Sequence, residues 1–487
     1  MAYFSLTNNA IAWGQVRLRG GWRNVIITIG TCAVLVVGLI LLCIRVQFAP
    51  FKDILYGWTM ALLGVQIAWT MLAACGGIQS GIRRDVDAKI IESHRLMPIS
   101  DMAAVLGYIV GSSSQAMVGA GLTLIIGMVT ATAAGIGAIN WLAANGILLV
   151  FAVVCSTAIA MLSFQSKGAF AAMIALLSLG VVSGGVVFAV LPGLTLLCAP
   201  AIGNNIFGII ERGIAWNWTY LLSFCMQFVF AGLFFLAAAR KFRRDYVPAF
   251  GWALGIALLL AWVVLSVSGI LAWPQISSRA LRGVAVDART QIIASTIGTM
   301  LLALVPISSA AWQENNSRRR RALRDPAWAR QPASPEIITV LASLIVLLVP
   351  LSTVPRLRLP LDGTIACAVG LFAGMMCVRF LLGMLYLIRR PTLLIVGFWL
   401  VCAWAGPPVL DAIRYQFMWE RGVNAPQVTA LTGFGPVGLM MAVSGVGVPS
   451  PWMGAALQIL TAAVMSWLYR LMCRPRPVVA KAPSIQL

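Results

Sequence analysis

Long apolar stretches separated by short polar segments dominate the sequence. A helix needs roughly 20 apolar residues to cross the hydrocarbon core of a membrane. Because lipid offers no partners for backbone polar groups, such stretches are expected to be helical. The pattern predicts twelve spans, over residues 25–44, 54–78, 103–130, 136–162, 169–197, 217–239, 249–273, 290–312, 337–354, 363–388, 392–410 and 451–470.

The polar segments suggest that the chain consists of two similar halves. In each half, two spans lead to a charged segment and four spans follow; these segments are Ile82–Asp101 and Glu314–Glu336. Because six spans are an even number, the two halves would share one orientation, as a parallel repeat does. We therefore predict an all-α, polytopic membrane protein with about twelve transmembrane helices in two parallel six-helix halves.

The expected boundaries follow from this arrangement. The stretch 429–447 is apolar but rich in glycine, so we expect a re-entrant or interfacial element there rather than a thirteenth span. The predicted parts are a cytoplasmic interfacial segment (1–24), a first half (25–239) with a charged cytoplasmic loop (82–101), a second half (240–470) with a cytoplasmic loop (313–335), and a cytoplasmic tail (471–487).

Composition agrees with a membrane protein. Of the 487 residues, 60% are hydrophobic and only 10% are charged, whereas soluble domains have about 25% charged residues. The net charge of +21 could indicate nucleic acid, but 24 of the 35 Lys and Arg lie on the side of the N-terminus and 10 on the other, with Arg379 in a span. This is the positive-inside pattern. It favours cytoplasmic termini in a bacterial cytoplasmic (inner) membrane, and no nucleic-acid partner.

The first charged segment has features of a docking helix. Apolar residues recur at helical spacing among charges of both signs, Pro98 would end the helix, and Ser100 could cap the next one. A loop that only orients the chain needs only Lys and Arg, so this mixture suits a protein partner, with a solvated connector as the alternative. The candidate docking residues are Arg83, Asp85, Val86, Asp87, Ile90, Glu92, Arg95 and Pro98.

A family resemblance accompanies this segment. Two spans, a charged helix running through Glu92–Ser100 with Leu-Met-Pro-Ile-Ser at its end, and a third span containing Gly107 resemble the permease subunits of type-2 ABC exporters. The resemblance implies a coupling helix that docks on a separate ABC ATPase subunit, expected in two copies, which would hold the ATP and Mg. The second loop lacks the Pro-Ile-Ser form; its candidate docking residues are Arg318, Arg319, Arg320, Arg321 and Arg324.

The chain lacks the residues that an ATPase, an ion-coupled carrier or a membrane transferase would need. A P-loop needs Lys after Gly, and none of the five lysines follows a glycine. We therefore expect no ATPase in this chain. Its ten cysteines include no CxxC pair, so we expect no metal site, and we also expect no cofactor and no enzyme activity here. An ion-coupled secondary carrier would place carboxylates or His in the spans, yet all 14 acidic residues fall in loops or at span ends. A membrane transferase would need a catalytic base or metal, and no suitable pair of carboxylates is evident.

Some polar residues within the spans could line a pathway. Interhelical hydrogen bonding is the other explanation for the three glutamines, and Arg379 could reach the interface or meet an anionic substrate. The few charges in the spans favour a lipidic or amphipathic substrate, and the resemblance implies its export. The possible pathway residues are Gln66, Gln115, Gln227 and Arg379.

Overall fold

The regular elements of the described residues are all helices. The computed structural model describes residues 9–46, 50–165, 190–198, 218–280, 288–322, 334–357, 361–388, 392–420, 434–435, 438 and 451–473. The chain divides into two compact units, Met1–Ser295 and Thr296–Leu487. This boundary lies within a helix and differs from the predicted junction at residue 240, and the two six-span halves stay a prediction.

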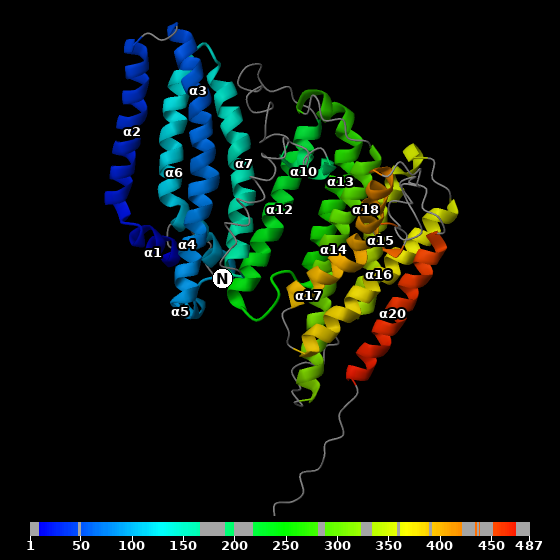
Figure 1. Ribbon diagram of the computed structural model, residues 1–487. Helices are drawn as coiled ribbons and strands as arrows, with labels where there is room; N and C mark the ends of the chain where they lie inside the picture. The colour runs from blue at the N-terminus through cyan, green and yellow to red at the C-terminus, as the bar shows by residue number, and fades with distance from the viewer. Residues whose placement is uncertain are drawn as a thin grey trace, which may run out of the picture. The chain divides into compact units, whose positions relative to one another are not determined.

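The first unit contains a bundle of long helices and two short helices, α1 and α5, at one end of it (Figure 1). Its helices are α1 (Ala10–Leu18), α2 (Gly21–Val46), α3 (Phe51–Ile67), the π-helical turn η1 (Ala68–Ala73), α4 (Ala74–Asp87), α5 (Ile90–Leu96), α6 (Asp101–Ala133), α7 (Ala138–Ser163), α10 (Pro192–Cys198), α12 (Trp218–Arg243) and α13 (Trp252–Ala280).

The second unit is also built from helices, and α16 packs along α20 within it (Figure 1). Its helices are α14 (Ala288–Ala322), which begins before the boundary, α15 (Pro335–Leu357), α16 (Leu361–Ile388), α17 (Thr392–Trp399), the π-helical turn η3 (Leu400–Ala405), α18 (Gly406–Glu420) and α20 (Pro451–Cys473).

Ten helices among the described residues are long and apolar enough to cross a membrane, and a pair bent by 46°, Ile395–Trp404 with Gly406–Glu420, would make eleven. The prediction of an all-α, polytopic membrane protein is confirmed. The expected span over 169–197 lies mostly outside the described residues, as does the element over 429–447. The count of twelve therefore stays a prediction.

Helix α6 lies at the centre of the first unit and contacts α1, α2, α3, α4, α7 and α12. Its glycines permit this close packing. A Cβ on Gly111 would lie 2.7 Å from the carbonyl oxygen of Ala12 in α1, and one on Gly127 would lie 2.0 Å from the ring of Trp141 in α7. Small residues at helix crossings allow backbones to approach in this way.

The second long helix continues beyond its apolar part. Phe51–Asp87 forms one continuous 37-residue helix made of α3, η1 and α4. The first part of the charged segment is therefore the end of a transmembrane helix rather than a loop. As a result, Asp85 lies on the same rigid rod as the second span and packs beside α6.

Candidate functional site

The first charged segment, Ile82–Asp101, forms the end of one helix and a second short helix, joined by a sharp corner. Helix α4 ends at Asp87, and Lys89 adopts a left-handed conformation with φ of 57°. Helix α5 then runs from Ile90 to Leu96, and Ser100 caps α6 by accepting a hydrogen bond from the Ala103 amide at 3.2 Å. The predicted cap at Ser100 is confirmed. The predicted single helix is wrong, because the left-handed residue turns the chain after α4.

Asp85 is buried at the inner side of this corner. Its Oδ2 accepts hydrogen bonds from the Tyr108 hydroxyl at 2.7 Å and from Gln15 Nε2 at 3.0 Å. The ring nitrogen Nδ1 of His94 lies 3.7 Å from the same oxygen and 2.8 Å from the Tyr108 hydroxyl. Asp85 is only 1% exposed. The expectation that it belongs to a docking surface is therefore corrected: its carboxylate holds α1, α4, α5 and α6 together.

Arg95 joins α5 to another transmembrane helix, α12. Its Nε donates to the carbonyl oxygen of Phe242 in α12 at 2.6 Å, and its Nη1 lies 3.8 Å from the carboxylate of Asp245. The Asp245 side chain is 70% exposed, so the ion pair adds little and the bond to the carbonyl is the stronger link. Arg95 therefore also acts as an anchor rather than as a residue presented to a partner.

The remaining candidate docking residues form the outer surface of the corner. Leu96 is 87% exposed and Ile90 is 43% exposed, and charged side chains flank them. We call the exposed residues Asp87, Ile90, Glu92, Leu96 and Pro98 the α5 surface. Arg83 and Val86 are only partly exposed. This surface combines the apolar side chains of Ile90 and Leu96 with the carboxylates of Glu92 in α5 and Asp87 at the end of α4, and the opposite side of α5 is bonded to the bundle.

The α1 helix supports the corner from the side of the N-terminus. Asn9 caps α1, with its side-chain oxygen accepting from the amides of Ile11 and Ala12. Arg19 follows α1, and its Nη2 donates to the carbonyl oxygen of Gly77 in α4 at 2.6 Å. Burial, and next the positive charge of Arg84, lower the pKa of Arg19. The described part of the expected interfacial segment, from Asn9 onward, is thus built into the packing around α4 and α6.

Arg379 lies at the centre of a buried cluster in the second unit. It is 1% exposed, and its Nη2 donates to Glu314 at 3.0 Å and to Glu336. Its guanidinium stacks 4.9 Å from the ring centroid of Tyr469, whose hydroxyl donates to Glu314 at 3.1 Å. Two carboxylates therefore contact one nitrogen, Nη2, of this guanidinium. Arg379 is thus paired with protein carboxylates, and both its position relative to the membrane interface and a contact with an anionic substrate stay predictions.

Glu314 and Glu336 mark the two ends of the second charged segment, whose predicted loop (313–335) is wrong in its first part, because α14 continues to Ala322. Glu314 is near the end of α14, and Glu336 is in the first turn of α15. Arg379 therefore fastens both ends of this loop to α16, and Tyr469 extends the link to α20. The side chains of Arg318, Arg319, Arg320 and Arg321 lie outside the described residues, as does Arg324, so docking at this loop stays a prediction.

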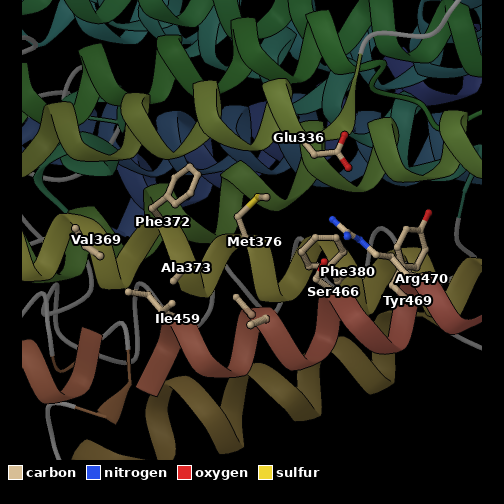
Figure 2. A pocket seen from close by; sticks show the side chains of 12 residues that line it. Glu336, Val369, Phe372, Ala373, Met376, Phe380, Ile459, Ser466, Tyr469 and Arg470 are labelled. Atoms are coloured by element: carbon tan, nitrogen blue, oxygen red, sulfur yellow. The ribbon is translucent and has the colours of Figure 1, made fainter. Parts of the chain in front are cut away.

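A cavity of about 630 Å³ runs between α16 and α20 beside this cluster. Figure 2 shows Val369, Phe372 and Ile459 at one end, and Glu336 and Arg470 near the other. The cavity thus has an apolar part and a part with one acidic and one basic side chain. This division matches a molecule with an apolar chain and a charged group.

The three glutamines each bond to a neighbouring segment. Gln66 accepts from Thr123 in α6, Gln115 donates to the carbonyl oxygen of Arg19, and Gln227 donates to the carbonyl oxygen of Leu197 at 2.8 Å. Such bonds join helices in a membrane. A role in lining a pathway stays a prediction for all three.

Sequence reasoning missed His94, Tyr108, Glu314 and Glu336 as members of these clusters. The one available signal was that His94 is the only histidine in the chain and falls in the first charged segment. Among the residues that the structure describes, no group of three or more His, Cys, Asp or Glu could hold a metal ion.

No protein-family model, curated protein or solved structure matches the chain. The fold by itself defines the class as an α-helical, multi-pass membrane protein. Any narrower function must be argued from the α5 corner, the Arg379 cluster and the cavity beside it.

Proposed function

We propose that the chain is the membrane-spanning permease of a transporter that a separate ABC ATPase energises. The observation that carries this proposal is the α5 corner. It presents the α5 surface outward, while His94 and Arg95 on its other side contact α4, α6 and α12. A partner that moved α5 would therefore move three long helices together.

The second charged loop supports the same mechanism. Its two ends, Glu314 and Glu336, converge on Arg379, so displacement of this loop would be transmitted to α16 and, through Tyr469, to α20. Both charged segments are thus attached to the last long helix of their predicted half. Two copies of an ATPase, one for each segment, would close on each other when ATP binds and separate after hydrolysis. This cycle would move both charged segments and change access to a pathway between helices.

The cavity between α16 and α20 supports an amphipathic substrate. Its walls are mostly apolar, with Val369, Phe372 and Met376 among them, and its charged end offers Glu336 and Arg470. A chain-bearing molecule could place its apolar part along the walls and its polar group at that end. Export of such a molecule is the direction that the resemblance to type-2 ABC exporters favours.

Affinity purification of the full chain in mild detergent tests the proposal. We expect wild type to retain an ATPase in a ratio of two per chain, and the double variant Glu92→Arg/Leu96→Glu to lose one of the two copies, since both side chains are exposed on the α5 surface. Neutralising Arg318–Arg321 should release the second copy. The control is Arg17→Glu/Leu18→Glu, which also reverses one charge and replaces one exposed leucine with glutamate, but on α1.

The control should retain the ATPase at the wild-type ratio. If only the α5 variant releases it, one docking site per chain and a dimer of chains replace the two-site arrangement. If no preparation contains an ATPase, or if the control loses it as fully as the α5 variant does, the proposal is wrong.

An ion-coupled carrier is the second candidate, and the structure adds an observation in its favour. Carboxylates that the sequence places at span ends are partly or fully buried: Asp85 beside His94, and Glu314 beside Arg379. Buried ionisable groups in membrane proteins often carry protons. Transport in proteoliposomes that follows an imposed pH gradient, without any ATPase, would favour this candidate over the first.

A further inference from the structure

A second, smaller cavity lies where α6 begins and α12 ends in the first unit. Its volume is about 310 Å³, and its lining is formed by Asp101, Arg240, Arg243, Arg244 and Val247. Three arginines therefore share the lining of this cavity with a single carboxylate. Arg243 lies 3.4 Å from Asp101, which leaves two positive charges in excess at this cavity.

Two ordinary effects explain why arginines occur here. Basic residues in the last turn of a helix complement its dipole, and basic residues on this side of the membrane orient the chain. Neither effect explains why the side chains converge on one cavity. Topogenic charges act equally well when they point separately into water.

The position of Arg240 strengthens this point. A Cβ on Gly251 would lie 2.5 Å from its Nη1, so the guanidinium lies against the residue that precedes α13. The beginning of a helix carries unpaired amides and a partial positive charge. A guanidinium placed there is repelled unless an anion joins the two. In addition, Nε of Arg240 is buried and has no hydrogen-bond partner in the described part of the chain.

We propose that this cavity binds a phosphate group, carried either by the headgroup of an anionic membrane lipid or by a free phosphate ion. Arginine is suited to this role because its planar fork of donors matches the oxygens of phosphate. Basic pockets between membrane helices are recognised lipid-headgroup sites in general. The bound phosphate would bridge Arg240 and Arg244, and would draw Arg243 away from Asp101.

The site has a direct structural route to the α5 corner. Phe242, which accepts the hydrogen bond from Arg95 of α5, lies in the same turn of α12 as Arg240 and Arg243. Occupancy of the cavity would fix the end of α12 to which α5 is attached. The site itself does not depend on the proposed transport function, because it rests only on the charges and geometry around α12.

Thermal unfolding of the purified full chain in neutral detergent tests the site. Phosphatidylglycerol, phosphatidylcholine and inorganic phosphate are added separately at matched concentrations. We expect phosphatidylglycerol to raise the melting temperature of wild type by several degrees and phosphatidylcholine to leave it unchanged. The shift should be lost in Arg240→Gln/Arg244→Gln. It should remain in Arg17→Gln/Arg23→Gln, which removes the same charge from exposed positions away from the cavity.

The arms also identify the source of the phosphate. A shift with phosphatidylglycerol alone assigns the site to a lipid headgroup, and an equal shift with inorganic phosphate assigns it to a free ion. If the control variant loses the shift as fully as the cavity variant, general attraction of anions to a basic surface explains the result and the proposal is overturned. Absence of any shift in wild type overturns it as well.

A gain-of-binding variant covers the case in which the double variant does not fold. Asp101→Asn removes the carboxylate that competes for Arg243, so it should lower the concentration of phosphatidylglycerol at half-maximal shift several-fold. Unchanged or weaker binding by Asp101→Asn contradicts the proposed role of Arg243.

Discussion

The hydroxyl of Tyr108 donates a 2.7 Å hydrogen bond to the carboxylate of Asp85, and this bond joins the end of the second long helix to the third. Both side chains are buried, with exposed fractions of 0% and 1%. Gln15 and His94 approach the same carboxylate from α1 and α5. The charged segment is therefore positioned by a network inside the protein, and only its outer face is available to a partner.

Replacing Tyr108 with Phe tests the strength of this network. The variant removes a donor from a buried, charged acceptor, and such a bond contributes about 1.5–3 kcal/mol. We expect the free energy of unfolding to fall by about that amount in denaturant titrations of the detergent-solubilised protein. The matched control is Tyr246→Phe, since Tyr246 is 58% exposed and its replacement should change stability by less than about 0.5 kcal/mol.

Glycines at a helix crossing and glycines facing open space in α6 should differ in their tolerance of alanine. In Gly111→Ala, the new Cβ would lie 2.7 Å from the backbone oxygen of Ala12, so α1 must shift. Overpacking of this kind costs about 1–3 kcal/mol. Gly121 lies on the same helix with nothing within 4 Å of its Cβ position, and Gly121→Ala should be neutral or stabilising by up to about 1 kcal/mol. Equal melting temperatures for the two variants would contradict the close packing of α1 on α6.

The hydrophobic pattern of the sequence was sufficient to predict an all-helical membrane protein. The polar residues after Pro98 also predicted the cap at Ser100, because a cap depends on residues close together in the chain. The hydrophobic pattern could not show that the second helix continues to Asp87, since the apolar run ends earlier and the rest is held by packing against α6. The sequence therefore predicted a solvated side chain for Asp85, which follows an apolar run, whereas the structure buries it.

The partners of the buried charges could not be predicted for a related reason. Asp85 and Tyr108 are 23 positions apart, and Gln15 and Asp85 are 70 apart. Hydropathy identifies spans but carries no information on which faces of two spans meet. The same limit applies to Arg379. Hydropathy places Glu314 and Glu336 at the ends of apolar runs but does not show that their helices lie beside α16.

The Arg379 cluster predicts a large loss of stability when its one cation is removed. In Arg379→Met, Glu314 and Glu336 remain together without a counter-charge, and breaking a buried ion pair costs about 3–5 kcal/mol. We expect about 3 kcal/mol, because the Glu336 side chain is 47% exposed. The measurement is the free energy of unfolding in denaturant.

Neutralising the carboxylates supplies the control for that variant. Arg379→Met/Glu314→Gln/Glu336→Gln removes all three charges, and an uncharged replacement of a buried ionic cluster is often close to neutral. The triple variant should therefore be more stable than Arg379→Met alone. A triple variant as unstable as the single one would show that Arg379 contributes through its packing on Phe380 and Tyr469 rather than through charge.

Arg95 allows docking and transmission to be separated, if the proposed permease function holds. Arg95→Gln loses the bond to the Phe242 carbonyl oxygen but leaves the α5 surface intact. We expect the variant to retain its ATPase on purification. Stimulation of ATP hydrolysis by substrate should fall roughly tenfold, which corresponds to a loss of about 1.4 kcal/mol of coupling.

The matched control for Arg95→Gln is Arg84→Gln, which removes the same charge from an exposed position on α4. It should retain both the ATPase and the stimulation. If Arg95→Gln releases the ATPase as Glu92→Arg/Leu96→Glu does, Arg95 belongs to the docking surface and not to the link with α12. If stimulation is unchanged, motion of α5 reaches the membrane helices through His94 and Asp85 instead, because those are the other bonds that tie α5 to the bundle.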